Sequence, residues 1–221
     1  NNPNNPTGKV YSLEELSYLY QLAKKYKLYV LSDEAYSDFV IDQNEFISFA
    51  NLDTEKKHTI VINSISKNFG ISGWRLGYVI TNPNLISELL KINQHLITCP
   101  PTILEYYVDK HFDEIISITK PQIKDLTLKR KQIMDYMNSL SLEFLPGTTT
   151  FYFFISISKS KLNSEEFCWK LLQEHHISTV PGIGYGKSCD KFIRVSIGSE
   201  SIERVKKGLK IITNLISSTS I

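Results

Sequence analysis

The stretch NSISKNFGISGWRLGY, residues 63–78, combines one lysine and one arginine with small polar residues and glycines. Lys67 follows closely on two serines, and a glycine comes three residues after it. A lysine amine becomes a nucleophile when its pKa is lowered, and it can then hold an aldehyde as an imine. The planar fork of Arg75 suits a phosphate group. The alternative interpretation of Lys67 is a surface lysine that follows a strand.

Three other short motifs carry groups that could act in such a site. They are NPTG at residues 5–8, DEAY at residues 33–36 and FIRVSI at residues 192–197. A carboxylate such as Asp33 favours the protonated form of a nitrogen within hydrogen-bond range, although Asp33 could also simply cap a turn. Arg194 lies among apolar residues, where burial of its charge is costly without a partner. The alternative for Arg194 is an edge-strand arginine with its head in solvent.

Helices and apolar strands in the first half of the chain must position Asp33, Lys67 and Arg75. Ser12 and Glu15 form a predicted capping box that begins a helix ending near Tyr26. Short apolar runs predict buried strands, and polar residues follow the ends of two of them, where open α/β sheets bind ligands. The expected strands are 28–31, 59–62 and 78–80, and a helix is expected over 84–95.

The second half of the chain has a different pattern. Two helices are expected over 102–116 and 121–140, with the second beginning at Pro121. After them, the pattern predicts a smaller α+β domain. Its expected strands are 151–155, 177–180 and 192–197, and its expected helices are 164–176 and 199–216. We therefore place a domain boundary between residues 120 and 121, with domains at 1–120 and 121–221.

Composition excludes several classes of protein. The 221 residues are 42% hydrophobic and carry a formal net charge of +2, without the basic excess expected of a nucleic-acid-binding protein. No apolar run reaches membrane-spanning length. Three scattered cysteines argue against a disulfide framework and a zinc site, and they favour a cytoplasmic setting. The chain starts inside a loop without an initiator methionine, so we expect it to be the C-terminal part of a longer protein.

Taken together and in order, the motifs resemble those of the class I and II aminotransferases, which are fold type I enzymes that depend on pyridoxal 5'-phosphate. The resemblance covers nearly the whole chain. It implies an α/β fold: part of the fold type I large domain, a mostly parallel sheet with helices on both faces, followed by a smaller α+β C-terminal domain. The motifs that carry it are NPTG, DEAY, SISK, GWRLGY and RVSIG.

The resemblance also assigns roles around the cofactor ring. Lys67 matches the lysine that holds the cofactor as an imine and later moves a proton as a base. Asp33 matches the aspartate that pairs with the ring nitrogen. Tyr36 and Asn5 match two donors to the ring's phenolic oxygen, although Tyr36 taken alone could be a packed aromatic residue.

Other matched residues bind the phosphate and the substrate. Ser64 and Arg75 match phosphate ligands, and Ser66 is a further candidate on the phosphate side. Arg194 matches the arginine that binds the substrate's α-carboxylate. The implied function is transfer of an amino group between an amino acid and a 2-oxo acid in a cytoplasmic homodimer, with no metal, nucleic acid or membrane involved.

Two alternatives remain open at this point. The same residues occur in fold type I relatives that decarboxylate amino acids or cleave carbon–sulfur bonds. The chain could also be a catalytically incomplete fragment that acts only through association. The family's first half supplies a glycine-rich turn and a stacking aromatic residue that have no match here, so we expect these 221 residues alone to be an incomplete enzyme.

Overall fold

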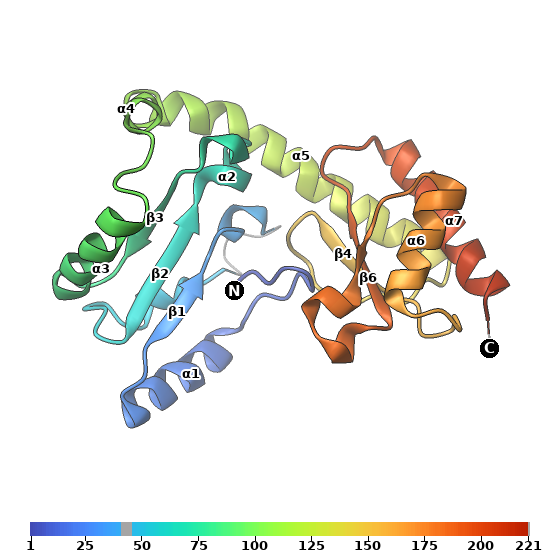
Figure 1. The fold of residues 1–221 in the computed structure, drawn as a ribbon, viewed down its shortest axis with the longest axis horizontal. Helices are drawn as coiled ribbons and strands as arrows, with labels where there is room; N and C mark the ends of the chain where they lie inside the picture. Colours follow the sequence, from blue (N-terminus) through green and yellow to red (C-terminus); the bar gives the residue numbers. More distant parts are fainter. Residues whose placement is uncertain (41–45, 221) are drawn as a thin grey trace. The chain divides into compact units, whose positions relative to one another are not determined.

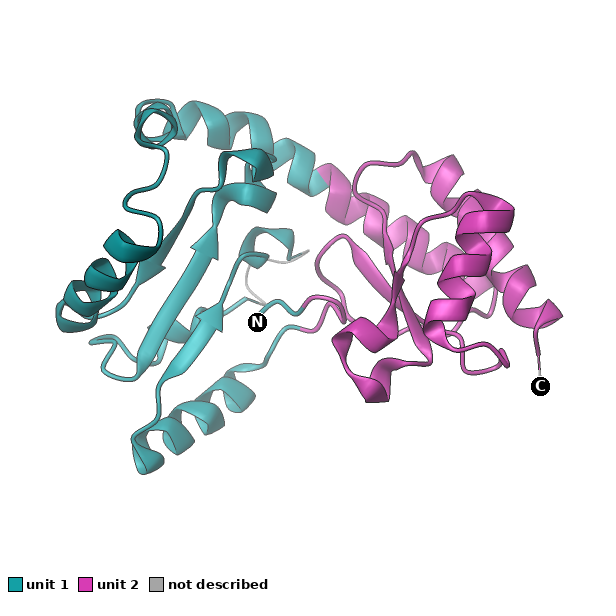
Figure 2. Ribbon diagram, in the orientation of Figure 1, with its two compact units in different colours: residues 1–4, 10–124 teal, residues 5–9, 125–221 magenta. Residues whose placement is uncertain are grey.

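The computed structural model describes residues 1–40 and 46–220, which form two compact units. Unit 1 comprises residues 1–4 and 10–124, and unit 2 comprises residues 5–9 and 125–221 (Figure 2). The sequence placed residues 5–9 in the first domain. They group with unit 2 because the Gly8 carbonyl accepts hydrogen bonds from the Thr149 backbone N–H at 3.2 Å and from Thr149 Oγ1 at 2.8 Å. The assignment of the units to a cofactor-binding domain and a small domain stays a prediction.

Unit 1 contains a three-stranded sheet in the order β1-β2-β3 (Figure 1). Strands β1 (Val30–Asp33) and β2 (Thr59–Ser64) are parallel, whereas β3 (Gly77–Ile80) runs antiparallel to β2. This part of the expected sheet therefore has one parallel and one antiparallel pair. Since β3 is reversed, its first residues lie at the same edge as the last residues of β1 and β2.

The helices of unit 1 begin where the sequence supplies caps. Helix α1 (Leu13–Tyr26) has the predicted capping box, in which Ser12 Oγ accepts from the Glu15 N–H and the Glu15 carboxylate accepts from the Ser12 N–H. Helix α3 (Pro83–Leu96) starts with a proline, after an asparagine cap. The other elements are α2 (Ile65–Asn68), α4 (Thr102–Lys110) and the 3₁₀ turns η1 (Ser37–Phe39), η3 (Phe49–Asn51) and η4 (Ser72–Trp74).

Helix α5 (Phe112–Ser139) corrects the predicted helix boundary. The sequence placed a break before Pro121, but the helix continues through that residue. Proline lacks an N–H and therefore removes one helical hydrogen bond, yet the turns on both sides of it remain helical. The actual break lies at His111, whose φ of −112° and ψ of 20° end α4.

Unit 2 is built on an antiparallel sheet in the order β4-β6-β5. Its strands are β4 (Tyr152–Ser156), β5 (Val180–Pro181) and β6 (Phe192–Ser196). Helices α6 (Ser164–His175) and α7 (Ile202–Ser218) pack with α5 around one hydrophobic core. Fully buried members of that core include Ile133, Ile155, Phe167, Leu171 and Ile193. Two 3₁₀ turns, η5 (Gly182–Tyr185) and η6 (Lys187–Cys189), connect β5 to β6.

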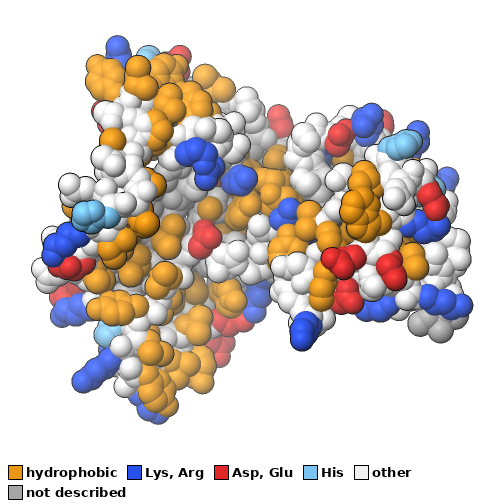
Figure 3. Space-filling view, viewed as in Figure 1, with side chains coloured by type: hydrophobic (Ala, Val, Ile, Leu, Met, Phe, Trp, Pro, Cys, Tyr) orange, Lys and Arg blue, Asp and Glu red, His pale blue; other side chains and the backbone are white. Residues whose placement is uncertain are grey.

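The two units differ in how well they bury their apolar residues. In unit 1 large hydrophobic side chains remain exposed on the sheet and on α3, including Leu31 at 63%, Val79 at 40% and Leu96 at 75%. Figure 3 shows many hydrophobic side chains across the visible face of this unit. Unit 2 exposes far fewer of them. Among the described residues, no helix combines the length and the apolar character needed to span a membrane.

Candidate active site

One edge of the unit 1 sheet collects four of the predicted site residues. Asp33 is the last residue of β1, and Ser64 is the last residue of β2. Lys67 lies in α2, directly after β2. Because Ser64 pairs with Gly77 at the start of β3, Arg75 is brought to the same edge. Carboxyl ends of strands are where open α/β sheets bind ligands.

The Lys67 backbone is fixed by the serines before it. Ser64 Oγ accepts from the Ser66 N–H at 3.1 Å and donates to the Leu76 carbonyl at 3.5 Å. Ser66 is buried, and Lys67 is half-buried. Gly70 follows with a φ of +67°, a conformation that favours glycine, so the chain can turn sharply after the lysine. The region around Lys67 is therefore held by local hydrogen bonds.

Arg75 adopts a left-handed backbone conformation with a φ of 58°, which is uncommon for a residue other than glycine. Its side chain is exposed, and its Nη1 donates to the Ser72 carbonyl at 2.8 Å. Arg75 ends the 3₁₀ turn η4 and lies two residues before β3. This conformation could not be predicted from the sequence, because a single left-handed residue other than glycine has no local pattern of its own.

Asp33 and Tyr36 lie in the turn that follows β1. Asp33 Oδ1 accepts from the Ala35 N–H at 3.1 Å, so one of its oxygens caps this turn, as the alternative interpretation of Asp33 expected. Tyr36 is buried, and its ring centroid lies 6.1 Å from that of Phe39. The structure thus places Asp33 at the edge of the sheet, with one oxygen engaged in the turn.

Glu34 is a residue that the sequence reasoning missed. Its side chain is 3% exposed, and Oε1 accepts from Ser32 Oγ at 2.9 Å, Ser48 Oγ at 3.0 Å and the Phe49 N–H at 3.0 Å. A buried carboxylate needs such donors to offset its loss of hydration. Glu34 therefore fixes the turn between Asp33 and Tyr36. The only signal in the sequence was its position next to Asp33.

In unit 2, Arg194 and Asn5 are brought together over 189 residues of sequence. Arg194 Nη1 donates to Asn5 Oδ1 at 3.0 Å. The guanidinium carbon of Arg194 lies 4.2 Å from the centroid of the Tyr152 ring and 5.6 Å from that of Tyr185. Burial raises the pKa of Tyr185, and the nearby Arg194 charge opposes that rise. These contacts hold the half-buried guanidinium in one orientation.

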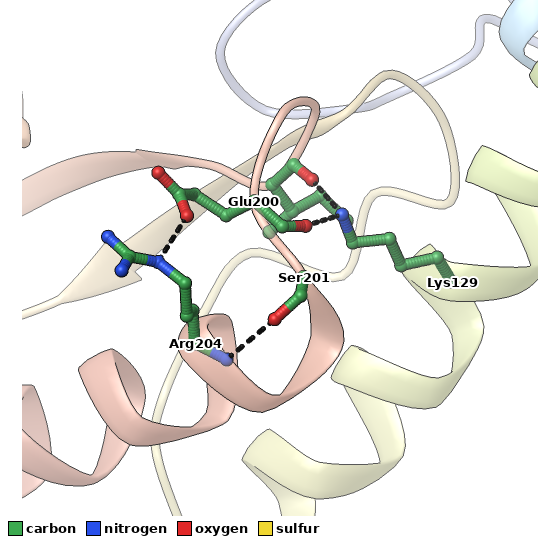
Figure 4. A network of polar contacts seen from close by, with 5 residues as sticks. Lys129, Glu200, Ser201 and Arg204 are labelled. Carbon is green, nitrogen blue, oxygen red and sulfur yellow. Dashed lines mark hydrogen bonds and ion pairs between the residues drawn. The ribbon is translucent and has the colours of Figure 1, made fainter.

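A second network, also missed from the sequence, fixes the segment that follows β6 (Figure 4). Lys129 of α5 donates to the backbone carbonyls of Ile197 and Glu200. The Glu200 carboxylate accepts from Arg204 Nε at 2.5 Å, and Ser201 Oγ accepts from the Arg204 N–H at 3.3 Å. Burial lowers the pKa of Lys129. The strand that carries Arg194 is therefore anchored at its carboxyl end.

The side chains gathered at the unit 1 edge suit an aldehyde and a phosphate. They supply an amine, two hydroxyls, a guanidinium and a carboxylate. Hydroxyl and guanidinium groups are good phosphate donors, and an amine forms a covalent bond with an aldehyde carbon. Within residues 1–40 and 46–220, no three His, Cys, Asp or Glu side chains gather as metal ligands.

Comparison with known proteins gives one consistent family. The family model described as aminotransferase class I and II matches residues 1–212. The chain is 33% identical over 218 residues to (5-formylfuran-3-yl)methyl phosphate transaminase of Methanocaldococcus jannaschii, covering 98% of this chain and 56% of that protein. It is 31% identical over 218 residues to aspartate aminotransferase of Pyrococcus abyssi, covering 95% of this chain and 56% of that protein.

Solved structures agree with this result. The fold matches that of an aromatic aminotransferase from Pyrococcus horikoshii with a TM-score of 0.89 and 28% identity, covering 98% of this chain and 58% of that chain. It matches an aspartate aminotransferase from Thermotoga maritima with a TM-score of 0.86 and 30% identity, covering 97% of this chain and 55% of that chain. The chain spans about half the length of the curated relatives it matches.

Proposed function

Because this chain belongs to the class I and II aminotransferase family, we propose that the protein carrying it transfers an amino group between an amino acid and a 2-oxo acid. The observation that carries the proposal is the pairing of Ser64 with Gly77, which brings Lys67 and Arg75 to one sheet edge. An amine suits the carbonyl group of pyridoxal 5'-phosphate, and a guanidinium suits its phosphate.

The residues of unit 1 fit this cofactor. When bound, pyridoxal 5'-phosphate supplies an electron sink that stabilises negative charge at the substrate's α-carbon. Lys67 Nζ would bind its aldehyde carbon, and Ser64, Ser66 and Arg75 would donate to its phosphate. Asp33 would accept from the protonated ring nitrogen through an oxygen that does not cap the turn, and Tyr36 would donate to the phenolic oxygen. Lys67 is also the base proposed to move the α-proton.

The contacts in unit 2 support a role for Arg194 in binding the substrate's α-carboxylate. An arginine fork binds a carboxylate through two parallel hydrogen bonds, provided that its orientation is fixed. Asn5 and Tyr152 provide that orientation. Since arginine can only donate, Asn5 must present its Oδ1 to Arg194. The proposed donation from Asn5 to the cofactor's phenolic oxygen therefore falls to Nδ2.

Assembly as a homodimer and a cytoplasmic location also belong to this proposal. The exposed apolar residues of unit 1 support association, because such surfaces mark interaction sites. Cys99, Cys168 and Cys189 are all free thiols, which supports a reducing compartment. An association-only role for the chain would share the apolar surface, but it would not need an ordered segment around Lys67.

Borohydride trapping tests the proposed function. The intact protein is loaded with pyridoxal 5'-phosphate, reduced with borohydride and digested, and the modified peptide is identified by mass spectrometry. We expect the label on Lys67 in the wild type and its loss in Lys67→Ala, whereas the exposed Lys110→Ala serves as the matched control. Equal labelling in Lys67→Ala would refute the assignment. Production of a 2-oxo acid without release of CO₂ or a thiol would separate transamination from decarboxylation and carbon–sulfur cleavage.

A further inference from the structure

Arg130, in the middle of α5, is almost completely buried, with 1% of its surface exposed. In the part of the chain that the structure describes, its guanidinium contacts backbone carbonyls rather than a carboxylate. Nη2 donates to the Gly147 carbonyl at 2.6 Å, and Nη1 donates to the carbonyls of Thr150 and Tyr152. The guanidinium carbon lies 4.0 Å from the centroid of the Phe153 ring. Burial lowers the Arg130 pKa to about 10, so this position is costly for the charged side chain.

Two of these carbonyls, those of Gly147 and Thr150, belong to one strained loop that precedes β4, and the third belongs to Tyr152, the first residue of β4. Thr150 has a φ of 65°, which is unfavourable for a β-branched residue and persists only where neighbouring contacts enforce it. Arg130 binds the Thr150 carbonyl at 3.4 Å, and Thr150 Oγ1 accepts from the Tyr152 N–H at 3.2 Å. Arg130 therefore holds the loop in a conformation that its own sequence disfavours.

This loop holds residues 5–9 in place. Thr149 donates two hydrogen bonds to the Gly8 carbonyl, at 3.2 Å and 2.8 Å. A Cβ atom added to Gly147 would lie 1.9 Å from the Thr7 carbonyl oxygen, so the two backbones are in direct contact. Gly8 has a φ of +72°, and an added Cβ there would lie 3.1 Å from Arg130 Nη2. The position of this segment therefore depends on the loop.

Two residues held by these contacts, Asn5 and Tyr152, contact Arg194 directly. Asn5, three residues before Gly8, accepts from Arg194 Nη1 at 3.0 Å. Tyr152, whose carbonyl Arg130 binds, places its ring 4.2 Å from the Arg194 guanidinium carbon. A shift of the loop would therefore disturb both the polar contact and the ring contact that orient Arg194.

We propose that Arg130 is a positioning residue for carboxylate recognition: it fixes the segment 147–152, which is the loop before β4 with the first residue of that strand, and thereby Asn5 and Tyr152, which orient Arg194. The consequence for substrate binding rests on the proposed function of Arg194, whereas the consequence for the loop does not. Arginine suits the task because one planar group can serve several carbonyls and also stack on a ring. Lysine at this position offers only a single nitrogen.

The test uses the intact protein with Arg130→Met, Arg130→Lys and, as the matched control, Lys131→Met. Methionine fills much of the volume of the arginine side chain but leaves the three carbonyls without their donor, which is the defect that the variant is designed to create. We expect Arg130→Met to raise KM for the amino acid roughly tenfold, with a smaller change in kcat, while cofactor retention is kept. Arg130→Lys should restore part of the loss. Lys131 is exposed, so its variant should behave as the wild type.

Hydrogen exchange supplies a readout that does not require activity. The Thr149 amide donates to the Gly8 carbonyl and should exchange roughly tenfold faster in Arg130→Met. Thr149→Val, which removes only the hydroxyl bond to Gly8, provides a second route to the same defect and should raise KM about fivefold. If Arg130→Met does not fold, Thr149→Val and Arg130→Lys together test whether Arg130 acts as a positioning residue.

The outcomes separate the two proposals. Wild-type KM in Arg130→Lys and Thr149→Val, together with unchanged exchange at residue 149 in Arg130→Lys, would overturn the positioning role of Arg130. A lower melting temperature with unchanged KM in the Arg130 variants would also overturn the positioning role, because Arg130 would then stabilise the fold without affecting substrate binding. If the wild-type protein binds no cofactor, the proposed function fails, and the exchange rates still test whether Arg130 fixes the loop.

Discussion

Replacing Arg194 by methionine is expected to remove most of the protein's preference for a substrate that carries a carboxylate. The side chain lies in β6, where the backbone pairs on both sides, with Phe154 of β4 and Val180 of β5. The strand should therefore keep its place when the side chain changes. The variant then reports on the guanidinium rather than on the fold.

The expected magnitude follows from the contacts of Arg194. Its orientation is already fixed by Asn5 at 3.0 Å and by the Tyr152 ring at 4.2 Å, so little side-chain freedom remains to be lost on binding. A hydrogen bond to a charged group contributes about 1.5–3 kcal/mol, which corresponds to roughly a tenfold to 150-fold loss in kcat/KM. Tyr152→Leu keeps the guanidinium but removes the ring contact, and it should cost about 0.5–2 kcal/mol.

The assay compares an amino acid with the corresponding amine that lacks the carboxylate. In the wild type, kcat/KM should be much higher for the amino acid. In Arg194→Met this ratio should fall by the factor given above, while activity on the amine is nearly unchanged. Lys187→Met, an exposed substitution in unit 2, is the control for the loss of a positive charge. A variant at Arg194 that still discriminates as strongly as the wild type would refute the carboxylate role.

Three further predictions concern Glu34 and Cys168, which are buried, and Lys129, which is half-buried. Glu34→Ala should lower the free energy of unfolding by about 1.5–3 kcal/mol in denaturant titration, because three donors, including the Phe49 N–H, lose their acceptor; an unchanged midpoint would contradict this. Burial lowers the folded-state pKa of Lys129 below its ordinary value of 10.5, so the unfolded chain binds more protons between those two values. The free energy of unfolding of the wild type should therefore rise relative to that of Lys129→Met as the pH increases through that window. A difference between the two proteins that does not change with pH would contradict this prediction. Burial also raises the pKa of the Cys168 thiol, so iodoacetamide should modify the exposed Cys99 first, as peptide mass spectrometry can show.

Local sequence signals were sufficient where short-range chemistry decides the structure. The capping box at Ser12 and the helix to Tyr26 were predicted correctly, because their hydrogen bonds join residues close in the chain. The first strand was predicted two residues too early, at 28–31 instead of Val30–Asp33. Its apolar run began with Leu28 and Tyr29, which are 54% and 56% exposed, so hydrophobicity alone misplaced the pairing.

Long-range contacts could not be predicted from pattern. The sequence indicated Asn5 through resemblance, and Arg194 through resemblance and its apolar surroundings, but nothing local showed that they are hydrogen-bonded to each other. The sequence carried no local signal for the burial of Arg130, because that burial depends on carbonyls 17 to 22 residues away. The left-handed conformation of Arg75, which ends η4 shortly before β3, likewise had no local signal. Such positions require the tertiary structure.

The contact between Gly8 and Thr149 has a consequence for synthesis on the ribosome. The two residues are separated by 141 positions, so segment 5–9 emerges long before its partner loop exists. At a translation rate of about 5–20 residues per second, that interval lasts on the order of 7–28 s. During this time segment 5–9 lacks the loop with which it pairs in the native fold. Unit 2 can therefore complete its fold only after Thr149 has been synthesised and has bound the Gly8 carbonyl.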